Sequence, residues 1–187
     1  MTARRAFLRS FLAHPRAVGA LVPTSRRAVS DMLDLARVED ASLLVEFGAG
    51  SGVYTRELLR RMSPSARLVA FEVDERLAAG LAAEIDDPRL HLVTASAEDV
   101  ESHLDGGRVD LLVSALPFTS LPAAVRRRAL DVSPQILSPH GVMLVLQYSP
   151  FVQRELERRF ACVERRLSPV NLPPAFLFRC TGPLGGR

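Results

Sequence analysis

The sequence of 187 residues has few of the residues that secreted, metal-binding or membrane-spanning proteins depend on. It contains two cysteines, Cys162 and Cys180, whose spacing fits neither a metal site nor a redox motif, so we expect free thiols in a reducing cytosol. Its four histidines show no ligand spacing, which argues against a metal centre. No apolar run approaches the length needed to cross a bilayer, and the N-terminus has no sustained apolar signal region.

Lysine is absent as well, since all 24 basic residues are arginines. With so much alanine, leucine and arginine, this absence reflects a GC-rich genome better than a function. The distribution of the arginines is more informative. Six of them lie in the first thirty residues, before the first acidic residue, Asp31. The rest of the chain contains the other 18 arginines and all 21 acidic residues. Positive charge concentrated at one end favours a polyanionic partner there, either lipid headgroups or nucleic acid.

Residues 1–24 are therefore predicted to form a basic N-terminal segment, separate from a domain of residues 25–187. Within residues 4–13 the apolar side chains recur at i, i+4 spacing with arginines on the other face, which predicts a short amphipathic helix that Pro15 ends. A second helix, capped by Thr24 or Ser25, should precede the first strand.

The rest of the chain alternates short apolar runs with helical patterns, at roughly 53–62, 75–84, 97–104 and 121–137. The runs are continuous, as expected of strands covered on both faces. This alternation predicts an α/β fold with a Rossmann-like doubly wound parallel sheet. After a further helix at about 150–160, the last two runs are joined by a turn too short for a crossover, so they should pair antiparallel. The expected strands are Leu43–Phe47, Leu68–Phe71, Leu90–Val93, Val109–Val113, Val142–Gln147, Ala161–Leu167 and Ala175–Cys180.

A glycine-rich turn lies between the first strand and the following helix. The run Glu46–Gly52 reads E-x-G-x-G-x-G, and glycines allow a ligand to approach the backbone closely. A dinucleotide turn would need glycine where this chain has Val53. Glu72 ends the next apolar run, where a carboxylate can accept both hydroxyls of a ribose. The turn and Glu72 together predict a cofactor that contains adenosine.

These residues resemble the class I S-adenosylmethionine-dependent methyltransferases, and the resemblance covers nearly the whole chain, including a seven-strand order with an antiparallel last strand. It implies S-adenosylmethionine as cofactor and S-adenosylhomocysteine as product, with Glu46 near the methionine amino group and Glu72 on the ribose. Where the family often has an Asp for the adenine amine, this chain has Ser96, which either contacts adenine or caps a helix with Asp99. Backbone atoms of Ala97 could also contact adenine. The expected cofactor-binding residues are Glu46, Gly48, Ala49, Gly50, Gly52, Glu72, Val73, Ser96, Ala97, Glu98 and Ser114.

A second motif, Ser114–Phe118, follows the fourth strand. In amine-directed methyltransferases this place often reads Asn/Asp/Ser, apolar, Pro, aromatic, which supplies an acceptor for the target N–H and an aromatic face for the developing ammonium. Ala115 replaces the polar residue, so only a backbone carbonyl could accept there. Two tyrosines and His14 are candidate proton acceptors or cage members, with packing or solvent exposure as the alternative for each. The expected catalytic residues are Tyr54, Tyr148, Ala115, Pro117 and Phe118.

Four segments in order, 18–25, 115–117, 147–150 and 171–175, resemble the bacterial phospholipid N-methyltransferases. This resemblance implies stepwise methylation of phosphatidylethanolamine towards phosphatidylcholine. It also implies docking on anionic membrane through the basic N-terminal helix, on the inner face of the bacterial cell membrane. Packing of that helix on its own domain is the alternative. We expect a monomer that needs neither a metal nor nucleic acid.

Two other functions stay open at this point. The same cofactor could serve methylation of ribosomal RNA adenine or of a small hydrophobic metabolite. RNA dimethylases of this type usually carry an added C-terminal helical domain, whereas this chain ends at Arg187, soon after the last strand, which argues against RNA. A cofactor-binding or membrane-binding module without turnover is favoured only by Ser96 and Ala115, and the intact glycine turn opposes it.

Overall fold

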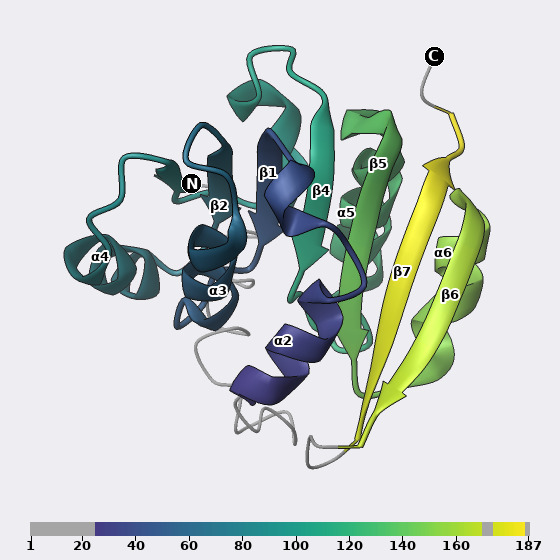
Figure 1. The fold of residues 1–187 in the computed structure, drawn as a ribbon. Helices are drawn as coiled ribbons and strands as arrows, with labels where there is room; N and C mark the ends of the chain where they lie inside the picture. Colours follow the sequence, from purple (N-terminus) through teal and green to yellow (C-terminus); the bar gives the residue numbers. More distant parts are fainter. Residues whose placement is uncertain (1–24, 170–173, 186–187) are drawn as a thin grey trace.

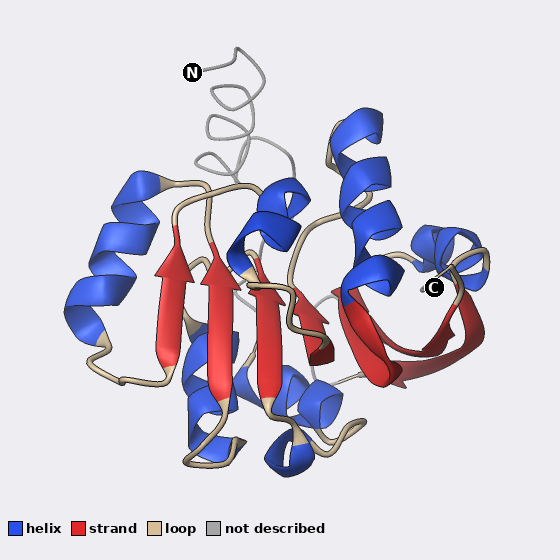
Figure 2. Ribbon diagram, turned by 90° about the horizontal axis from the view of Figure 1, so that it is seen from above, coloured by secondary structure: helices blue, strands red, loops and turns tan. Residues whose placement is uncertain are grey.

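The expected doubly wound sheet is present. A computed structural model describes residues 25–169 and 174–185. The expected helix at 4–13, residues 18–24 and residues 171–173 lie outside the described part. Seven strands form one sheet in the order β3-β2-β1-β4-β5-β7-β6, with helices on both sides (Figure 1, Figure 2). Neighbours among the first five strands pair parallel, whereas β7 is antiparallel to both β5 and β6, as predicted.

The strand bounds follow the apolar runs closely, except at the start of the fifth strand and the end of the seventh. The strands are β1 (Leu43–Phe47), β2 (Arg67–Phe71), β3 (Leu90–Val93), β4 (Val109–Ser114), β5 (Leu137–Gln147), β6 (Phe160–Ser168) and β7 (Ala175–Pro183). The prediction started β5 at Val142, five residues late. The early residues join the ladder through an irregularity: Leu137 pairs with Val109 and Val142 with Leu111. The polar residues between them hide this extension from any search for apolar runs.

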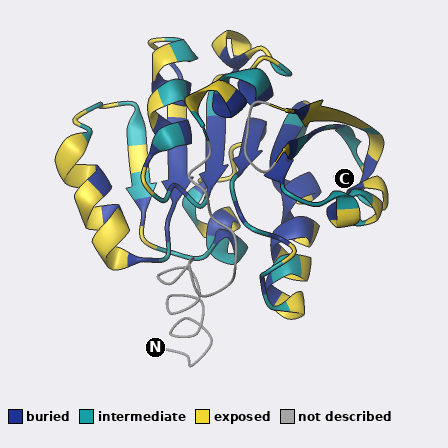
Figure 3. Cartoon of the chain, turned by 90° about the horizontal axis from the view of Figure 1, so that it is seen from below, coloured by how far each residue is buried: buried dark blue, intermediate teal, exposed yellow. Residues whose placement is uncertain are grey.

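Alternate residues of each central strand enter two different cores, because successive side chains of a strand point to opposite faces. Leu44 and Leu68 belong to the core under one face, and Val45 and Val69 to the core under the other. Their burial on both sides explains the continuous apolar runs. Figure 3 shows the central strands as the buried centre of the molecule and the outer helical surfaces as exposed.

Helices α2 (Arg26–Leu33) and α3 (Val53–Arg61) pack on the first face, with α4 (Glu75–Glu84) beside them. Ser25 caps α2, its hydroxyl accepting from the amide of Ala28 at 3.1 Å, which confirms one of the two predicted caps. The second face carries η3 (Ala97–His103), α5 (Ala123–Ile136) and α6 (Gln153–Glu157). Two short 3₁₀ helices, η2 (Val38–Asp40) and η4 (Pro150–Val152), complete the described elements.

Two helices differ from their predictions. The segment expected as an α-helix over 97–104 is the 3₁₀ helix η3, and the helix expected at about 150–160 is divided into η4 and a short α6. The chain then enters β6 at Phe160, earlier than predicted. Pairing of β6 with β7 from Phe160 onward leaves no room for a helix that runs to residue 160.

The sheet has a topological switch point between β1 and β4. From β1 the chain passes to β2 on one side, and later to β4 on the other. Ligands of open α/β sheets bind in the crevice that such a reversal leaves at the carboxyl ends of the strands. Both sequence motifs follow these two strands, so the fold brings them to one place.

Candidate active site

The glycine turn after β1 needs glycine at three positions. Gly48, Gly50 and Gly52 have φ of 81°, 54° and 76°, values that residues with a Cβ rarely adopt. The amides of Gly48 and Ala49 both donate to the carbonyl of Phe71, at 2.9 and 3.0 Å, which fastens the turn to the end of β2. The turn is therefore a fixed cradle.

Glu72 holds the turn from the neighbouring strand. Its Oε2 accepts from the amide of Gly50 and its Oε1 from the amide of Asp74, both at 2.8 Å. Burial raises the pKa of the Glu72 carboxyl above its usual value, while the two amides act in the opposite direction. A buried carboxylate at this edge, next to the glycine turn, is the arrangement that the sequence predicted.

Glu46 lies fully buried in β1 beneath the turn. Its Oε2 accepts from the Thr55 hydroxyl at 2.7 Å, while its Oε1 has no hydrogen-bond partner in the described part of the chain. Burial raises the pKa of Glu46 to about 7, with the Thr55 hydrogen bond lowering it and the charge of Glu72 raising it further. A buried acceptor without a donor indicates a place for a cationic or N–H group.

A pocket opens between the turn, the end of β2 and helix α5. Five of the predicted cofactor-binding residues line this pocket: Gly48, Glu72, Val73, Ser96 and Ala97. Its apolar side comes from residues that the sequence analysis did not assign to the site: Phe71, Ala95, Leu116, Leu121, Val125 and Ala129. Val125 and Ala129 lie four residues apart on one face of α5, and this spacing was a usable signal; Leu121 precedes that helix.

Ser96 serves as a helix cap and lines the pocket as well. Its hydroxyl accepts from the amide of Glu98 at 3.4 Å at the start of η3, while the residue also belongs to the pocket wall. The Glu98 side chain pairs with Arg128 at 3.2 Å. The helix-cap reading of Ser96 is therefore confirmed, and contact of Ser96 with adenine stays a prediction.

The motif after β4 lies against the glycine turn. A Cβ added to Gly48 would come within 3.1 Å of Leu116 Cδ2 and 3.8 Å of the Ala115 carbonyl carbon, so glycine permits the close contact. The Leu116 carbonyl accepts from Gln147 Nε2 at 2.8 Å and from the amide of Phe118 at 2.9 Å. Gln147, a buried polar residue at the end of β5, was not assigned a role from the sequence. It ties the motif to the sheet.

The predicted catalytic residues divide between the two faces. Tyr54 is buried with the core under α2 and α3, and Tyr148 and Ala115 are partly buried against that same core. Phe118 has an exposed fraction of 0% and packs in the opposite core, while Pro117 is partly exposed beside it. The structure therefore gives the Phe118 ring a packing role, and its contact with an acceptor stays a prediction.

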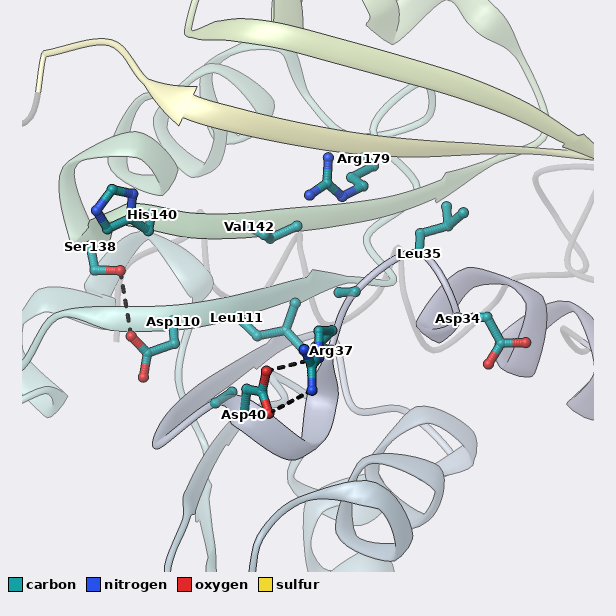
Figure 4. A pocket seen from close by; sticks show the side chains of 12 residues that line it. Asp34, Leu35, Arg37, Asp40, Asp110, Leu111, Ser138, His140, Val142 and Arg179 are labelled. Carbon is teal, nitrogen blue, oxygen red and sulfur yellow. Dashed lines mark hydrogen bonds and ion pairs between the residues drawn. The ribbon is translucent and has the colours of Figure 1, made fainter.

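A separate hollow lies at the opposite, amino edge of the sheet (Figure 4). Several of its polar side chains are engaged with protein groups: Arg37 pairs with Asp40 at 2.8 Å, and the Ser138 hydroxyl lies 3.4 Å from Asp110. Asp110 also accepts from the amides of Ser42 and Leu43, so its carboxylate tethers the start of β1. These contacts give this hollow a structural role, away from both motifs.

Comparison with known proteins identifies the family. Residues 44–141 match the family model described as a methyltransferase domain. The ornithine lipid N-methyltransferase of Singulisphaera acidiphila is 30% identical over 181 residues, 94% of each chain. The chain belongs to the methyltransferases. It is an enzyme that uses S-adenosylmethionine, as the glycine turn predicted.

Two further similarities differ in how much of each chain they cover. The solved N-methyltransferase NodS of Bradyrhizobium japonicum, in complex with S-adenosylhomocysteine, superposes with a TM-score of 0.70 over 94% of this chain and 99% of that one, at 16% identity. The ribosomal RNA small subunit methyltransferase A of Phenylobacterium zucineum is 38% identical over 87 residues, 45% of this chain and 29% of that protein. The first shows a shared fold, and the second a shared segment.

The residues of this methyltransferase fit the cofactor. The buried Glu46 Oε1 lacks a donor, which the methionine ammonium would supply, and the Glu72 carboxylate borders the pocket where a ribose would lie. The bound cofactor supplies an electrophilic methyl group on its sulfonium.

Among the described residues there is no cluster of side chains that could hold a metal ion, and no helix long and apolar enough to cross a membrane.

We expect cofactor affinity to depend on pH through Glu46. The pKa of about 7 in the folded protein lies above the usual 4.5, so the folded protein favours the protonated carboxyl. The contribution of this protonated form to folding stability is lost as the pH rises through 7. An ammonium group pairs with the ionised form, so the affinity for S-adenosylhomocysteine should fall below pH 7, approaching about tenfold per pH unit. Calorimetric titration from pH 6 to 8 measures this. Glu46→Gln should remove this dependence, and a dependence unchanged in Glu46→Gln would assign it to another group.

Proposed function

We propose that this enzyme methylates the primary amine of a membrane-lipid headgroup, with phosphatidylethanolamine and its mono- and dimethyl forms as acceptors. The observation that carries this proposal is the similarity to a lipid N-methyltransferase along 94% of both chains. The amino-acid pattern of the motif after β4 agrees with an amine acceptor. The similarity to the ribosomal RNA enzyme stops at 45% of this chain and gives RNA less support.

The acceptor amine would approach the methyl donor beside Ala115. The Leu116 carbonyl already accepts two hydrogen bonds within the protein, which leaves the backbone carbonyl of Ala115 as the acceptor for the amine N–H at this position. Gly48 packs against Ala115 and Leu116, which places the glycine turn next to that carbonyl. Tyr148, partly buried at the end of β5, would border the amine on the same side.

Positioning and water exclusion carry the chemistry in this proposal. An amine attacks through its neutral lone pair, which must lie in line with the methyl–sulfur bond, and orientation alone can lower a barrier substantially. Most of the turn and of the motif is buried, which excludes water from the reacting atoms. The headgroup amine would lose its proton to water before the reaction. Its lone pair would then bond to the methyl carbon as the methyl–sulfur bond breaks, so that the amine leaves carrying one more methyl group.

Ornithine lipid is a second candidate acceptor, favoured by the name of the relative that aligns over the full length. Both lipids present a primary amine beside an anionic group, so one site chemistry could serve either. The test incubates the enzyme and cofactor with vesicles that contain either lipid and measures the lipid mass by mass spectrometry. Gains of one, two and three methyl groups on phosphatidylethanolamine support the first acceptor, gains on ornithine lipid alone support the second, and no gain on either contradicts the proposal.

The basic N-terminal segment is proposed to hold the enzyme on the inner, anionic face of the bacterial membrane. Arginines attract anionic headgroups, and an amphipathic helix adds apolar contact. Deleting residues 1–16 should therefore weaken sedimentation with phosphatidylglycerol vesicles, and added salt should weaken binding of the full chain. Equal binding by both forms would rule out this role for residues 1–16. The affinity for S-adenosylhomocysteine, measured on both forms, controls for folding.

A further inference from the structure

The two most exposed large apolar side chains of the described residues lie at the same edge of the sheet. Phe151 is 83% exposed and Leu167 57% exposed. Phe151 belongs to η4, directly after β5, and Leu167 stands next to the last residue of β6. Because β5 and β6 are both antiparallel to β7, they run in the same direction and end at the same edge. This is the carboxyl edge, where the glycine turn also lies (Figure 1).

A hydrogen bond joins the two segments. Nη1 of Arg165 donates to Oε1 of Gln153 at 2.8 Å, and the Arg165 guanidinium lies 5.6 Å from the centre of the Phe176 ring. Arg165 shares its strand face with Leu167, since alternate residues of a strand point to the same side. Gln153 follows Phe151 by two residues. We call the surface of Phe151, Arg165 and Leu167 the rim.

The rim is basic as well as apolar. Arg165 is exposed on it, and Arg154, three residues after Phe151, is exposed as well. Among the acidic side chains of the same segments, Glu155 pairs with Arg126 and Glu164 with Arg179, whereas Glu157 accepts a hydrogen bond from the neutral Gln153. Exposed apolar side chains beside unneutralised arginines are typical of surfaces that bind the headgroup region of anionic membranes.

The rim is continuous with the active site. A hollow lined by Phe118, Thr119, Arg126, Phe151, Val152 and Glu155 connects it to the end of the motif after β4. A lipid acceptor must bring its amine to this motif while its acyl chains stay in the bilayer. The surface next to the motif on the carboxyl edge must then face the membrane.

We propose that the rim docks on an anionic lipid bilayer, with Phe151 and Leu167 entering the interfacial region and Arg165 facing the lipid phosphates. The inference rests on the proposed function, since it assumes an acceptor held in a membrane. It adds a membrane contact within the folded domain, independent of residues 1–24. In this orientation the carboxyl edge of the sheet lies on the bilayer, and the amino edge, with the hollow of Figure 4, faces away from it.

Tryptophan fluorescence tests the docking directly, because the sequence contains no tryptophan. Phe151→Trp places a single fluorophore on the rim. Leu184→Trp is the matched control, since Leu184 is 50% exposed and follows the end of β7 at the opposite edge. With vesicles of phosphatidylglycerol and phosphatidylcholine, the emission of Phe151→Trp should shift to shorter wavelength and that of Leu184→Trp should not. No shift at position 151, or an equal shift at both positions, would overturn the proposal.

Sedimentation gives a second measurement. Replacing Phe151 and Leu167 by serine should weaken binding to the same vesicles by about tenfold for each side chain. Leu184→Ser should bind like the wild type, and unchanged S-adenosylhomocysteine affinity confirms that the variants fold. These vesicles hold no primary amine, so their binding is independent of methyl transfer. If docking fails while phosphatidylethanolamine in detergent micelles is still methylated, the docking proposal is wrong and the proposed function stands. If docking is intact while methylation is absent, the proposed function is wrong and membrane binding by the rim stands.

Discussion

Replacing Glu72 by alanine is expected to lower the affinity for S-adenosylhomocysteine by about a hundredfold or more. A hydrogen bond to a charged acceptor contributes about 1.5–3 kcal/mol, and we predict that the Glu72 carboxylate accepts from two ribose hydroxyls. The variant also loses the contact from Glu72 Oε2 to the Gly50 amide, which holds the turn where we expect the cofactor to bind. Both effects act in the same direction. Isothermal titration calorimetry measures the loss.

The fold should change little in this variant. Burial raises the pKa of Glu72, so the carboxylate is costly to keep in the cofactor-free protein, and its removal offsets the lost contacts with the amides of Gly50 and Asp74. Glu101→Ala is the matched control, because Glu101 is exposed on η3. A Glu72→Ala variant that binds the cofactor like Glu101→Ala would show that Glu72 does not hold the ribose.

Replacing Gly52 by valine is expected to destabilise the whole domain. Gly52 has a φ of 76° at the start of α3, which costs a residue with a Cβ about 1–2 kcal/mol. A Cβ there would overlap the side chain of Leu81 and lie 2.8 Å from Nη1 of Arg56, which adds about 1–3 kcal/mol of overpacking. In a chain of this size the sum corresponds to a fall in melting temperature of roughly 5–20 °C.

Replacing Gly80 by alanine is expected to raise the melting temperature. Gly80 lies in α4, and a Cβ on it would meet nothing within 4 Å. Alanine in a helix interior is favoured over glycine by about 0.5–1 kcal/mol, so this variant should melt a few degrees higher. Differential scanning calorimetry of both variants compares them. A Gly52→Val variant that melts like the wild type would mean that the turn adapts to a side chain.

The fold could be predicted from the sequence because each central strand is covered on both faces. Continuous apolar runs identified β1 to β4 to within a residue, and the short turn after Leu167 predicted the antiparallel pair β6 and β7. The failures share one physical cause. The start of β5 and the helices η3, η4 and α6 depend on pairing or packing with distant segments, which local periodicity does not report.

The site was predictable where backbone chemistry demands a residue type. Three glycines with positive φ and a strand-end glutamate carry their own signature, and the structure places Gly50 and Glu72 in direct contact. Thr55 and Gln147 carried no such signature, because a hydroxyl on a helix and an amide at a strand end fit many roles. Burial of Phe118 in the core was likewise invisible in the sequence.

The most direct test of the central claim follows where the methyl group goes. One reaction contains the enzyme, the cofactor labelled in its methyl group, phosphatidylethanolamine vesicles and ribosomal RNA, with Glu72→Ala as the blank. Extraction with organic solvent then separates lipid from RNA. We predict that the label enters the lipid phase with the wild-type enzyme and stays at the blank level in the RNA. Label in the RNA, or label in neither phase above that of Glu72→Ala, would contradict the account of a lipid amine methyltransferase.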